Sequence, residues 1–276
     1  MTTTWLITGT SSGIGRELTQ LLLAKGDRVA ATLRKTDALD DLKAHYGDQL
    51  WIAPLDVTDT EQVRQVISRA FDELGTIDVV VSNAGYALFG AAEEVTDQQI
   101  QDQISTNLIG SIQVIRAAIP YLRAQGGGRI LQVSSEGGQI AYPNFSLYHA
   151  TKWAIEGFVE SVAQEVAPFN IEFTLIEPGP TQTNFGAALV SPPHLAVYED
   201  TPVGELRRAI ASGAFRLTGD PVKMAQAMIN STEVHPAPRR LTLGRGSYER
   251  VRVALVERTA VLDAQKEIAY STELDE

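Results

Sequence analysis

The chain has 276 residues, 44% of them apolar and 21% charged, which is the composition of an ordinary folded protein and excludes a disordered or collagen-like chain. Its 23 basic and 34 acidic residues give a formal net charge of −11, which disfavours nucleic acids and anionic membrane surfaces as partners. The absence of cysteine excludes disulfides and thiolate chemistry, and the four histidines show no metal-ligand spacing, so no metal site is expected.

In the first half of the chain, short apolar runs alternate with segments of helical periodicity. Strands are expected at Trp5–Thr8, Val29–Leu33, Leu50–Leu55 and Val79–Val81. Apolar residues recur at helical spacing after Gly15, around Leu39 and Leu42, and from Thr60 to Leu74. This alternation predicts a parallel sheet with helices packed against it.

The second half of the chain continues the alternation. Thr96 and Gln99 form a capping-box pattern that opens a long helix, whose apolar residues recur every three or four positions as far as Leu122. Further strands are expected at Ile130–Val133, Ile171–Ile176 and Arg240–Leu243, and a helix at Ser146–Ala167. No linker or repeat divides the chain, so residues 1–276 are expected to form one doubly wound α/β domain of the Rossmann type, with about seven parallel strands and helices on both faces.

Two segments depart from this regular alternation. Residues 184–215 contain Pro192, Pro193 and Pro202 among scattered apolar residues, which indicates an insertion long enough to be a substrate lid. Residues 245–276 are expected to form a final amphipathic helix followed by an acidic tail; Val251, Leu255 and Leu262 mark its apolar side. The N-terminus carries no basic segment before its apolar stretch, and no apolar run approaches the roughly 18 residues of a membrane span, so a cytoplasmic protein is expected.

A glycine-rich turn between the first strand and the first helix is the strongest local motif. It reads Thr8-Gly9-Thr10-Ser11-Ser12-Gly13-Ile14-Gly15. Glycines at a strand-to-helix turn let main-chain amides approach a pyrophosphate at the positive end of the helix. The motif lacks the lysine and spacing of a Walker loop, and a turn that holds no ligand is the alternative. We expect Gly9, Ser11, Ser12, Gly13, Ile14 and Gly15 to contact a dinucleotide.

A second group of residues combines a serine, a tyrosine and a lysine. Tyr148 and Lys152 are four residues apart on a predicted helix, so both side chains project from the same face. A tyrosine has a pKa near 10, and a neighbouring ammonium stabilises the phenolate, which makes the phenol a usable proton donor and acceptor. Ser135 follows the fifth strand, at the edge where open α/β sheets bind ligands.

From Trp5 to about Gly244 the chain resembles the short-chain dehydrogenase/reductase family. The resemblance rests on motifs in chain order: Thr8 to Gly15, Asn83-Ala84-Gly85, Asn107, Ser135, Tyr148-x-x-x-Lys152 and Pro178-Gly179. The family's spacing between serine and tyrosine selects Ser135 rather than Ser134. Two positions differ from the family pattern, since Ser82 stands where asparagine is usual and His149 where a small residue is common. We expect His149 to be a satisfied residue on the helix surface and Glu136 to be a loop carboxylate.

The resemblance implies roles for individual residues. Tyr148 would be the general acid and base, Lys152 would bind the nicotinamide ribose and tune Tyr148, and Ser135 would hydrogen-bond the reacting carbonyl. Asn107 would hold a water molecule in a proton relay. The other cofactor contacts that the resemblance implies are Asp56 and Val57 at adenine, Asn83, Ala84 and Gly85 in a turn beside the cofactor, and Pro178, Gly179, Thr181 and Thr183 over the nicotinamide.

The end of the second strand predicts a preference for NADP(H) over NAD(H). An NAD-selective site usually carries an acidic residue there, which binds the adenosine ribose and repels a 2′-phosphate. Leu33 occupies that position, and Arg34, with Lys35 beside it, offers a guanidinium suited to phosphate. Solvated loop cations are the alternative interpretation.

These patterns predict an oxidoreductase that transfers hydride between NADP(H) and a carbonyl or secondary alcohol. The alternatives are a non-catalytic NADP-binding regulatory protein, an epimerase or dehydratase of similar fold, and a methyltransferase, which would leave Tyr148 and Lys152 unexplained. The predicted lid favours an apolar, moderately bulky small-molecule substrate, with packing of the lid onto the sheet as the alternative; its apolar residues are Phe185, Leu189, Val190, Leu195, Val197 and Tyr198. The composition is compatible with a homodimer or a homotetramer.

Overall fold

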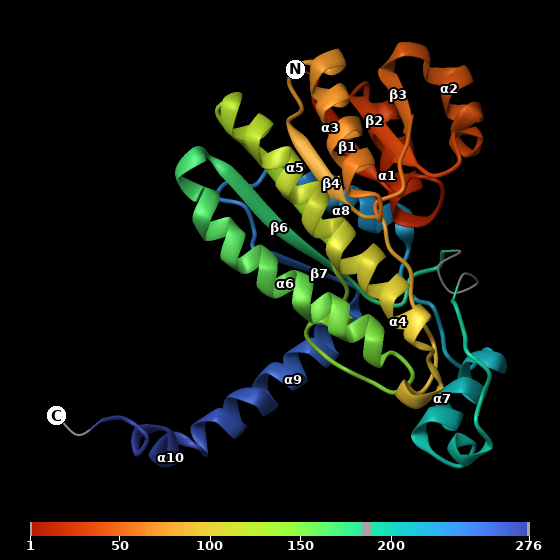
Figure 1. Ribbon diagram of the computed structural model, residues 1–276, viewed down its shortest axis with the longest axis vertical. Helices are drawn as coiled ribbons and strands as arrows, with labels where there is room; N and C mark the ends of the chain where they lie inside the picture. The colour runs from red at the N-terminus through yellow and green to blue at the C-terminus, as the bar shows by residue number, and fades with distance from the viewer. Residues whose placement is uncertain (1, 184–188, 275–276) are drawn as a thin grey trace.

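A computed structural model describes residues 2–183 and 189–274 and contains one seven-stranded sheet (Figure 1). The strands are β1 (Thr4–Thr8), β2 (Arg28–Leu33), β3 (Leu50–Pro54), β4 (Val79–Ser82), β5 (Gly128–Val133), β6 (Ile171–Pro178) and β7 (Arg240–Leu243). Their order is β3-β2-β1-β4-β5-β6-β7 and every neighbouring pair is parallel. This topology confirms the predicted doubly wound parallel sheet.

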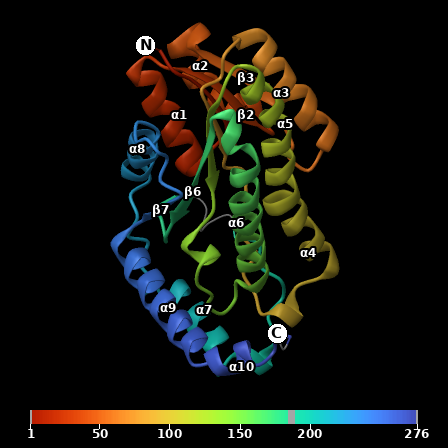
Figure 2. The same ribbon diagram turned by 90° about the vertical axis from the view of Figure 1, so that its left-hand side faces the viewer.

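Helices cover both faces of the sheet. The helices of the described residues are α1 (Gly13–Lys25), α2 (Asp40–Tyr46), α3 (Thr60–Leu74), α4 (Asp97–Ile104), α5 (Ser111–Ala124), α6 (Ser146–Val166), α7 (Pro202–Ala211), α8 (Pro221–Thr232), α9 (Arg245–Asp263) and α10 (Lys266–Tyr270). Figure 2 shows α1 and α8 on one side of the sheet and α3 and α5 on the other. No helix of the described ranges combines the length and the apolar composition that a membrane span requires.

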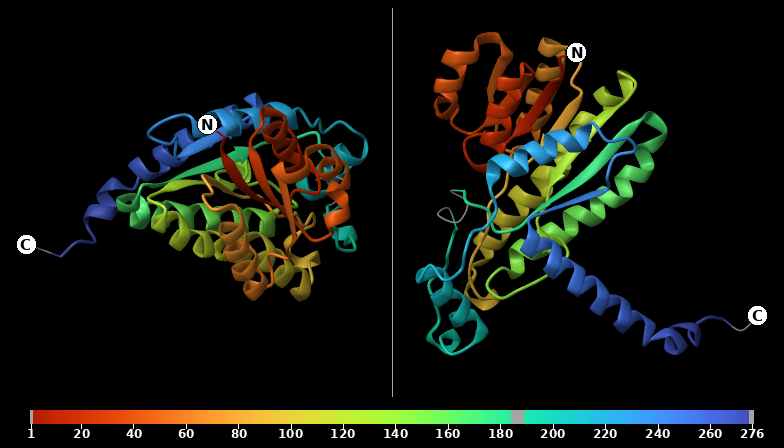
Figure 3. Two further views of the ribbon diagram at one scale, coloured as in Figure 1. Left: turned by 90° about the horizontal axis from the view of Figure 1, so that it is seen from above. Right: turned by 180° about the vertical axis from the view of Figure 1, so that it is seen from behind.

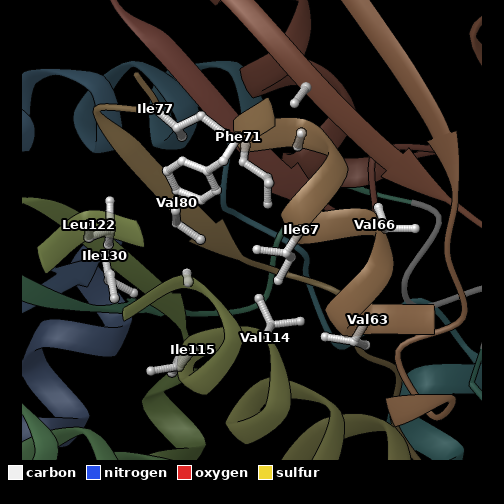
Figure 4. Close-up of a cluster of buried hydrophobic side chains, with 14 of the residues drawn as sticks. Val63, Val66, Ile67, Phe71, Ile77, Val80, Val114, Ile115, Leu122 and Ile130 are labelled. Carbon is white, nitrogen blue, oxygen red and sulfur yellow. The ribbon is translucent and has the colours of Figure 1, made fainter. Parts of the chain in front are cut away.

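Two hydrophobic clusters, one on each face, hold these layers together. Val80 and Ile130 project towards α3 and α5, where Ile67 and Val114 meet them (Figure 4), and Leu6 belongs to the same cluster. The alternate strand residues pack in the second cluster against α1 and α8. Because both faces are buried, central strands read largely as apolar runs, as Val79–Val81 in β4 does, and this helped to locate the strands in the sequence.

The expected long helix from Ile100 to Leu122 has a wider turn in its middle. The chain is α-helical in α4, π-helical over Ser105–Gly110 and α-helical again in α5. Thr96 caps α4 as predicted, since its hydroxyl accepts from the backbone N–H of Gln99. Apolar spacing of three or four does not distinguish an ordinary turn from one with an extra residue, so the interruption was invisible in the sequence.

The expected C-terminal helix is present as α9, but most of its apolar side is exposed. The base of α9 is attached to the described body through buried Ser247 and Val251, and Arg258 lies over the ring of Trp153 on α6, whereas Leu255 and Leu262 are 46% and 68% exposed. Both views in Figure 3 and the view in Figure 1 show α9 and α10 leading away from the sheet. The spacing of apolar residues specifies a stripe on a helix, but it does not specify that a partner surface lies within reach.

Candidate active site

The glycine-rich turn between β1 and α1 lies directly against the turn that follows β4. Gly9 has φ +73°, and a Cβ atom there would lie 2.8 Å from the Cα atom of Ala84. At Gly15 a Cβ atom would meet the carbonyl oxygen of Gly9 at 2.4 Å. Asn83 fastens the two turns by donating from Nδ2 to the carbonyl oxygens of Thr8 (2.8 Å) and Gly9 (3.0 Å). Glycine at positions 9 and 15 is therefore required by the close approach of main chain.

The N-terminus of α1 opens onto a cavity beside this turn. Ser12 is the N-cap residue and makes no side-chain capping bond within the described residues, and the first turn of α1 contains no acidic residue. The first main-chain N–H groups of the helix therefore face the cavity at the positive end of the helix dipole. This arrangement fits a phosphate-bearing group.

The cavity, of about 1250 Å³, extends along the carboxyl ends of the strands. The predicted site residues that line it are Gly9, Ser11, Ser12, Gly13, Ile14, Arg34, Asp56, Val57, Asn83, Ala84, Gly85, Ser135, Tyr148, Lys152, Pro178, Gly179, Thr181 and Thr183. Gly15 and Asn107 do not line it. The fold thus brings most of the predicted positions, from six different strand ends, to one continuous surface.

At the β2 and β3 end of the cavity, an arginine lies near a carboxylate. Arg34 is exposed and Leu33, immediately before it, is buried in the wall. Partial burial acts to raise the pKa of Asp56, but hydrogen bonds from the backbone and hydroxyl of Thr58 (3.0 and 2.7 Å) and the charge of Arg34 together lower it. Arg34 is therefore the cation available at this end of the cavity, whereas Lys35 does not line it.

Ser135, Tyr148 and Lys152 meet in the middle of the cavity. The hydroxyl of Ser135 accepts a hydrogen bond from the backbone N–H of Gly137 (3.0 Å), which holds the side chain in place. Tyr148 is buried on α6, and burial raises the pKa of its phenol to about 12, although a hydrogen bond with Ser135 partly opposes this. At neutral pH the phenol is therefore protonated.

The ammonium of Lys152 lies 5.5 Å from the centre of the Tyr148 ring, on the same face of α6. Its Nζ atom donates to the carbonyl oxygen of Val133 at the end of β5 (2.9 Å). Burial lowers the pKa of Lys152 to about 8, against the charge of Glu156, which acts to raise it. The lysine is thus held by the sheet and reaches the tyrosine as the helical spacing predicted.

Asn107 lies in the π-helical turn behind the cavity wall. Its Oδ1 atom accepts from the backbone N–H of Tyr86 (3.0 Å), and its Nδ2 atom donates to the carbonyl oxygen of Tyr86 (2.8 Å) and to the Thr151 hydroxyl (3.4 Å). The side chain is 1% exposed. In this arrangement Asn107 supports the Tyr86 segment of the wall, and its role in a proton relay stays a prediction.

His149 is not the helix-surface residue that the sequence suggested. It is buried against the ring of Tyr142, and its Nδ1 atom accepts from the backbone N–H of Tyr142 (3.4 Å). Its Nε2 atom has no hydrogen-bond partner among the described residues. Burial lowers the pKa of His149 to about 4, so the ring is neutral at pH 7. The loop before α6 folds back over this face of the helix, which helical spacing alone could not show.

This burial makes stability depend on pH. The folded-state pKa of His149 lies below the value of about 6.5 for an unfolded chain, so only the unfolded state gains a proton as the pH falls from 6.5 towards 4. Over that range the free energy of unfolding of the wild-type protein is expected to fall by up to about 1.4 kcal/mol per pH unit more than that of His149→Asn. The asparagine retains a hydrogen-bond acceptor near the position of Nδ1. Urea unfolding between pH 7 and 4 measures the difference, with exposed His45→Asn as the control. Parallel stability curves for wild type and His149→Asn would contradict it.

The cavity also has lining residues that the sequence interpretation missed. Tyr86, Tyr142 and Phe145 contribute rings, and Ile210 and Phe215 contribute apolar surface. Each lies in a loop or helix without a recognisable motif. Tyr86, however, directly follows Asn83-Ala84-Gly85, and an aromatic residue next to a motif could have been predicted to line the site. Glu136 also lines the cavity and is buried.

Of the apolar residues expected in the lid, Leu189 and Val190 line the cavity, whereas Leu195, Val197 and Tyr198 do not. Phe185 lies outside the described residues. Val190 pairs with the loop after β4: it donates to the carbonyl oxygen of Ala87 (3.1 Å) and accepts from the N–H of Phe89 (2.9 Å).

A buried ion pair attaches α7 to the rest of the structure. Arg207 donates to the carboxylate of Glu94 and, through Nε, to the Oδ1 atom of Asn144 (3.2 Å). Asn144 in turn donates to the carbonyl oxygen of Val203 on α7 (2.9 Å). Because breaking one partner of a buried pair leaves the other charge uncompensated, this contact fixes the place of α7 over the cavity.

The sequence of the chain is similar to sequences of known proteins. The family model described as short chain dehydrogenase matches residues 3–193. A curated relative, the oxidoreductase BOA17 of Botryotinia fuckeliana, is 36% identical over 250 residues, which are 90% of this chain and 91% of that protein.

Solved structures show the same likeness. A short-chain dehydrogenase from Streptomyces avermitilis has a TM-score of 0.92 and 36% identity, covering 99% of this chain and 100% of that one. An alcohol dehydrogenase from the archaeon Thermococcus sibiricus, complexed with 5-hydroxy-NADP, has a TM-score of 0.72 and 25% identity, covering 88% of this chain and 96% of that one.

Proposed function

The chain belongs to the short-chain dehydrogenase family, and on that premise we propose that it is an oxidoreductase that transfers hydride between NADP(H) and a carbonyl or secondary alcohol. The observation that carries the proposal is the meeting of Ser135, Tyr148 and Lys152 in the cavity that begins at the glycine-rich turn. A protein that only bound the nucleotide would not need these three side chains together.

The residues of the cavity fit a dinucleotide. The uncapped N-terminus of α1 would bind the pyrophosphate, and Arg34 would bind the 2′-phosphate of the adenosine ribose. Asp56 and Val57 would contact adenine, and Lys152 would contact the nicotinamide ribose. The relative from Thermococcus sibiricus, whose structure contains an NADP derivative, supports this choice of cofactor. When bound, the cofactor supplies or accepts the hydride.

The protein supplies orientation and the proton. Ser135 would hydrogen-bond the oxygen of the carbonyl group and so place it beside the phenol of Tyr148. In the reduction, Tyr148 donates its proton to the oxygen that becomes the alcohol, and in the oxidation its phenolate accepts that proton. The ammonium of Lys152 stabilises the phenolate, and Asn107 would continue a proton relay behind it. Because burial keeps the phenol protonated at neutral pH, alcohol oxidation is expected to become faster as the pH rises.

The substrate that this cavity fits best is apolar and moderately bulky. Phe145, Val190, Ile210 and Phe215 line its substrate end, and we propose that the segment around α7 acts as a lid over it. We expect NADPH oxidation with acetophenone, cyclohexanone or benzaldehyde to exceed that with pyruvate by at least about tenfold in kcat/KM, since burying a ring contributes roughly 2 kcal/mol.

Oxidation of NADPH and of NADH at 340 nm against this panel tests the function and the substrate class together. Turnover of pyruvate above the aromatic and alicyclic carbonyls would contradict the substrate class. Absence of turnover with every carbonyl of the panel, and with a wider set of quinones and steroids, would contradict the proposed reaction.

A further inference from the structure

Glu136 places a buried carboxylate in the wall of the proposed active site, directly after Ser135. Arg250 on α9 donates from Nη2 to both oxygens of this carboxylate, at 2.7 and 3.0 Å. The two residues are 114 positions apart in the chain. A buried carboxylate without a cation is strongly unfavourable, and Arg250 is the cation that pairs with Glu136 in the described structure.

The base of α9 touches the site at a second point. A Cβ atom on Gly179 would lie 1.8 Å from the Oγ atom of Ser247, which is buried on the first turn of α9. The backbone N–H of Gly179 donates to the carbonyl oxygen of Leu243 (3.1 Å), just before that helix. The first two turns of α9 are therefore packed against both the loop after β5 and the loop after β6, although the rest of the helix leads away (Figure 1).

Titratable and charged groups surround Tyr148, and among the described residues Glu136 is the carboxylate that acts on it. The titratable and charged groups that face this region are Glu136 after β5, Tyr142 in the loop before α6, His149 and Lys152 on α6, and Arg250 on α9 behind Glu136. Burial is the main cause of the raised pKa of Tyr148, and the charge of Glu136 adds to it. Burial is also the main cause of the raised pKa of Tyr142; there the charge of Glu136 acts in the same direction as burial, and the charge of Arg250 opposes it. Arg250 thus opposes the effect of the carboxylate at the phenol of Tyr142.

We propose that Arg250 is a positioning residue of the active site: by pairing with Glu136 it offsets a carboxylate that would otherwise oppose negative charge on Tyr148. The inference rests on the proposed function, because it assigns the effect to the tyrosine that transfers the proton. The inference gives the C-terminal helix an electrostatic role at the active site, whereas neither of the two hydrophobic clusters on the sheet includes a residue of that helix.

The pairing predicts shifts of opposite sign for its two members. Arg250→Met leaves the anion of Glu136 uncompensated and raises the pH at which alcohol oxidation becomes half-maximal by about 1 unit. Glu136→Gln leaves the cation and moves this midpoint to lower pH. The double variant Arg250→Met/Glu136→Gln has neither charge, so its midpoint returns towards that of the wild type. Arg250→Lys, which keeps the charge, stays near the wild-type midpoint.

The experiment measures kcat/KM for oxidation of 1-phenylethanol, cyclohexanol or benzyl alcohol with NADP⁺ from pH 6 to 10, using the alcohol that wild type oxidises fastest. Arg252→Met, an exposed arginine two positions further along α9, is the matched control and should keep the wild-type profile. NADPH affinity, measured by fluorescence, checks that each variant still binds the cofactor. Glu136→Gln tests the same charge relation if Arg250→Met does not fold.

The inference is overturned if the pH midpoint does not rise in Arg250→Met, or if the double variant Arg250→Met/Glu136→Gln keeps the risen midpoint. It is also overturned if Glu136→Gln alone leaves the midpoint unchanged. A purely structural role for Arg250 predicts lower rates at every pH and no rescue in the double variant. If Tyr148→Phe retains the same pH-dependent oxidation, or if no alcohol is oxidised, the proposed function itself fails and the inference falls with it.

Discussion

Replacing Tyr148 with phenylalanine is expected to lower turnover by about 10² to 10⁴-fold while NADP(H) affinity stays nearly unchanged. The phenylalanine ring preserves the packing of the buried side chain against Phe145 and Lys152, but the proton donor next to Ser135 is lost. Steady-state rates for the fastest carbonyl of the panel, together with fluorescence titration of NADPH, measure the two quantities separately.

Tyr142→Phe is the matched control for this experiment. Tyr142 also contributes a half-buried phenol to the cavity, and burial raises its pKa, but its ring lies edge-on against His149 and no lysine lies over it in the described structure. Its loss in turnover is expected to be much smaller than that of Tyr148→Phe. A Tyr148→Phe enzyme with more than half the wild-type turnover, under conditions where the chemical step limits the rate, would refute the role of Tyr148.

Replacing Arg34 with alanine is expected to weaken NADPH binding by about 10- to 150-fold and NADH binding much less. The estimate corresponds to roughly 1.5 to 3 kcal/mol for a charge-assisted contact with the 2′-phosphate, which NADH lacks. Arg34 lines the cavity at the end of β2, where Leu33 offers no carboxylate to repel that phosphate. Leu33→Asp should therefore weaken NADPH binding through repulsion.

Equilibrium titration of both cofactors into wild type and Arg34→Ala measures this preference. Lys35→Ala is the control, because Lys35 is exposed and does not line the cavity, so its effect on NADPH is expected to be smaller than that of Arg34→Ala. Equal losses for NADPH and NADH in Arg34→Ala, or tighter NADH binding by the wild type, would refute the predicted preference.

The sequence by itself determined the fold and the motifs. Apolar runs such as Val79–Val81 are strands because a parallel sheet buries both of its faces, and the helix with Tyr148 and Lys152 was predicted to start at Ser146, where α6 begins. The four-residue spacing placed Lys152 beside Tyr148 because a helix brings such positions to one face. These features depend on residues that are close together in the chain, so the sequence pattern was sufficient to predict them.

The tertiary structure alone decided what distant segments do to one another. His149 is buried because the loop containing Tyr142 folds over α6, and Leu255 is exposed because α9 leads away from the sheet. The partner of Glu136 could not be found in the sequence either, since Arg250 is 114 residues away on another element. Periodicity reports which face of an element is apolar, but burial and charge pairing depend on which surface arrives opposite that face, and only the folded chain determines this.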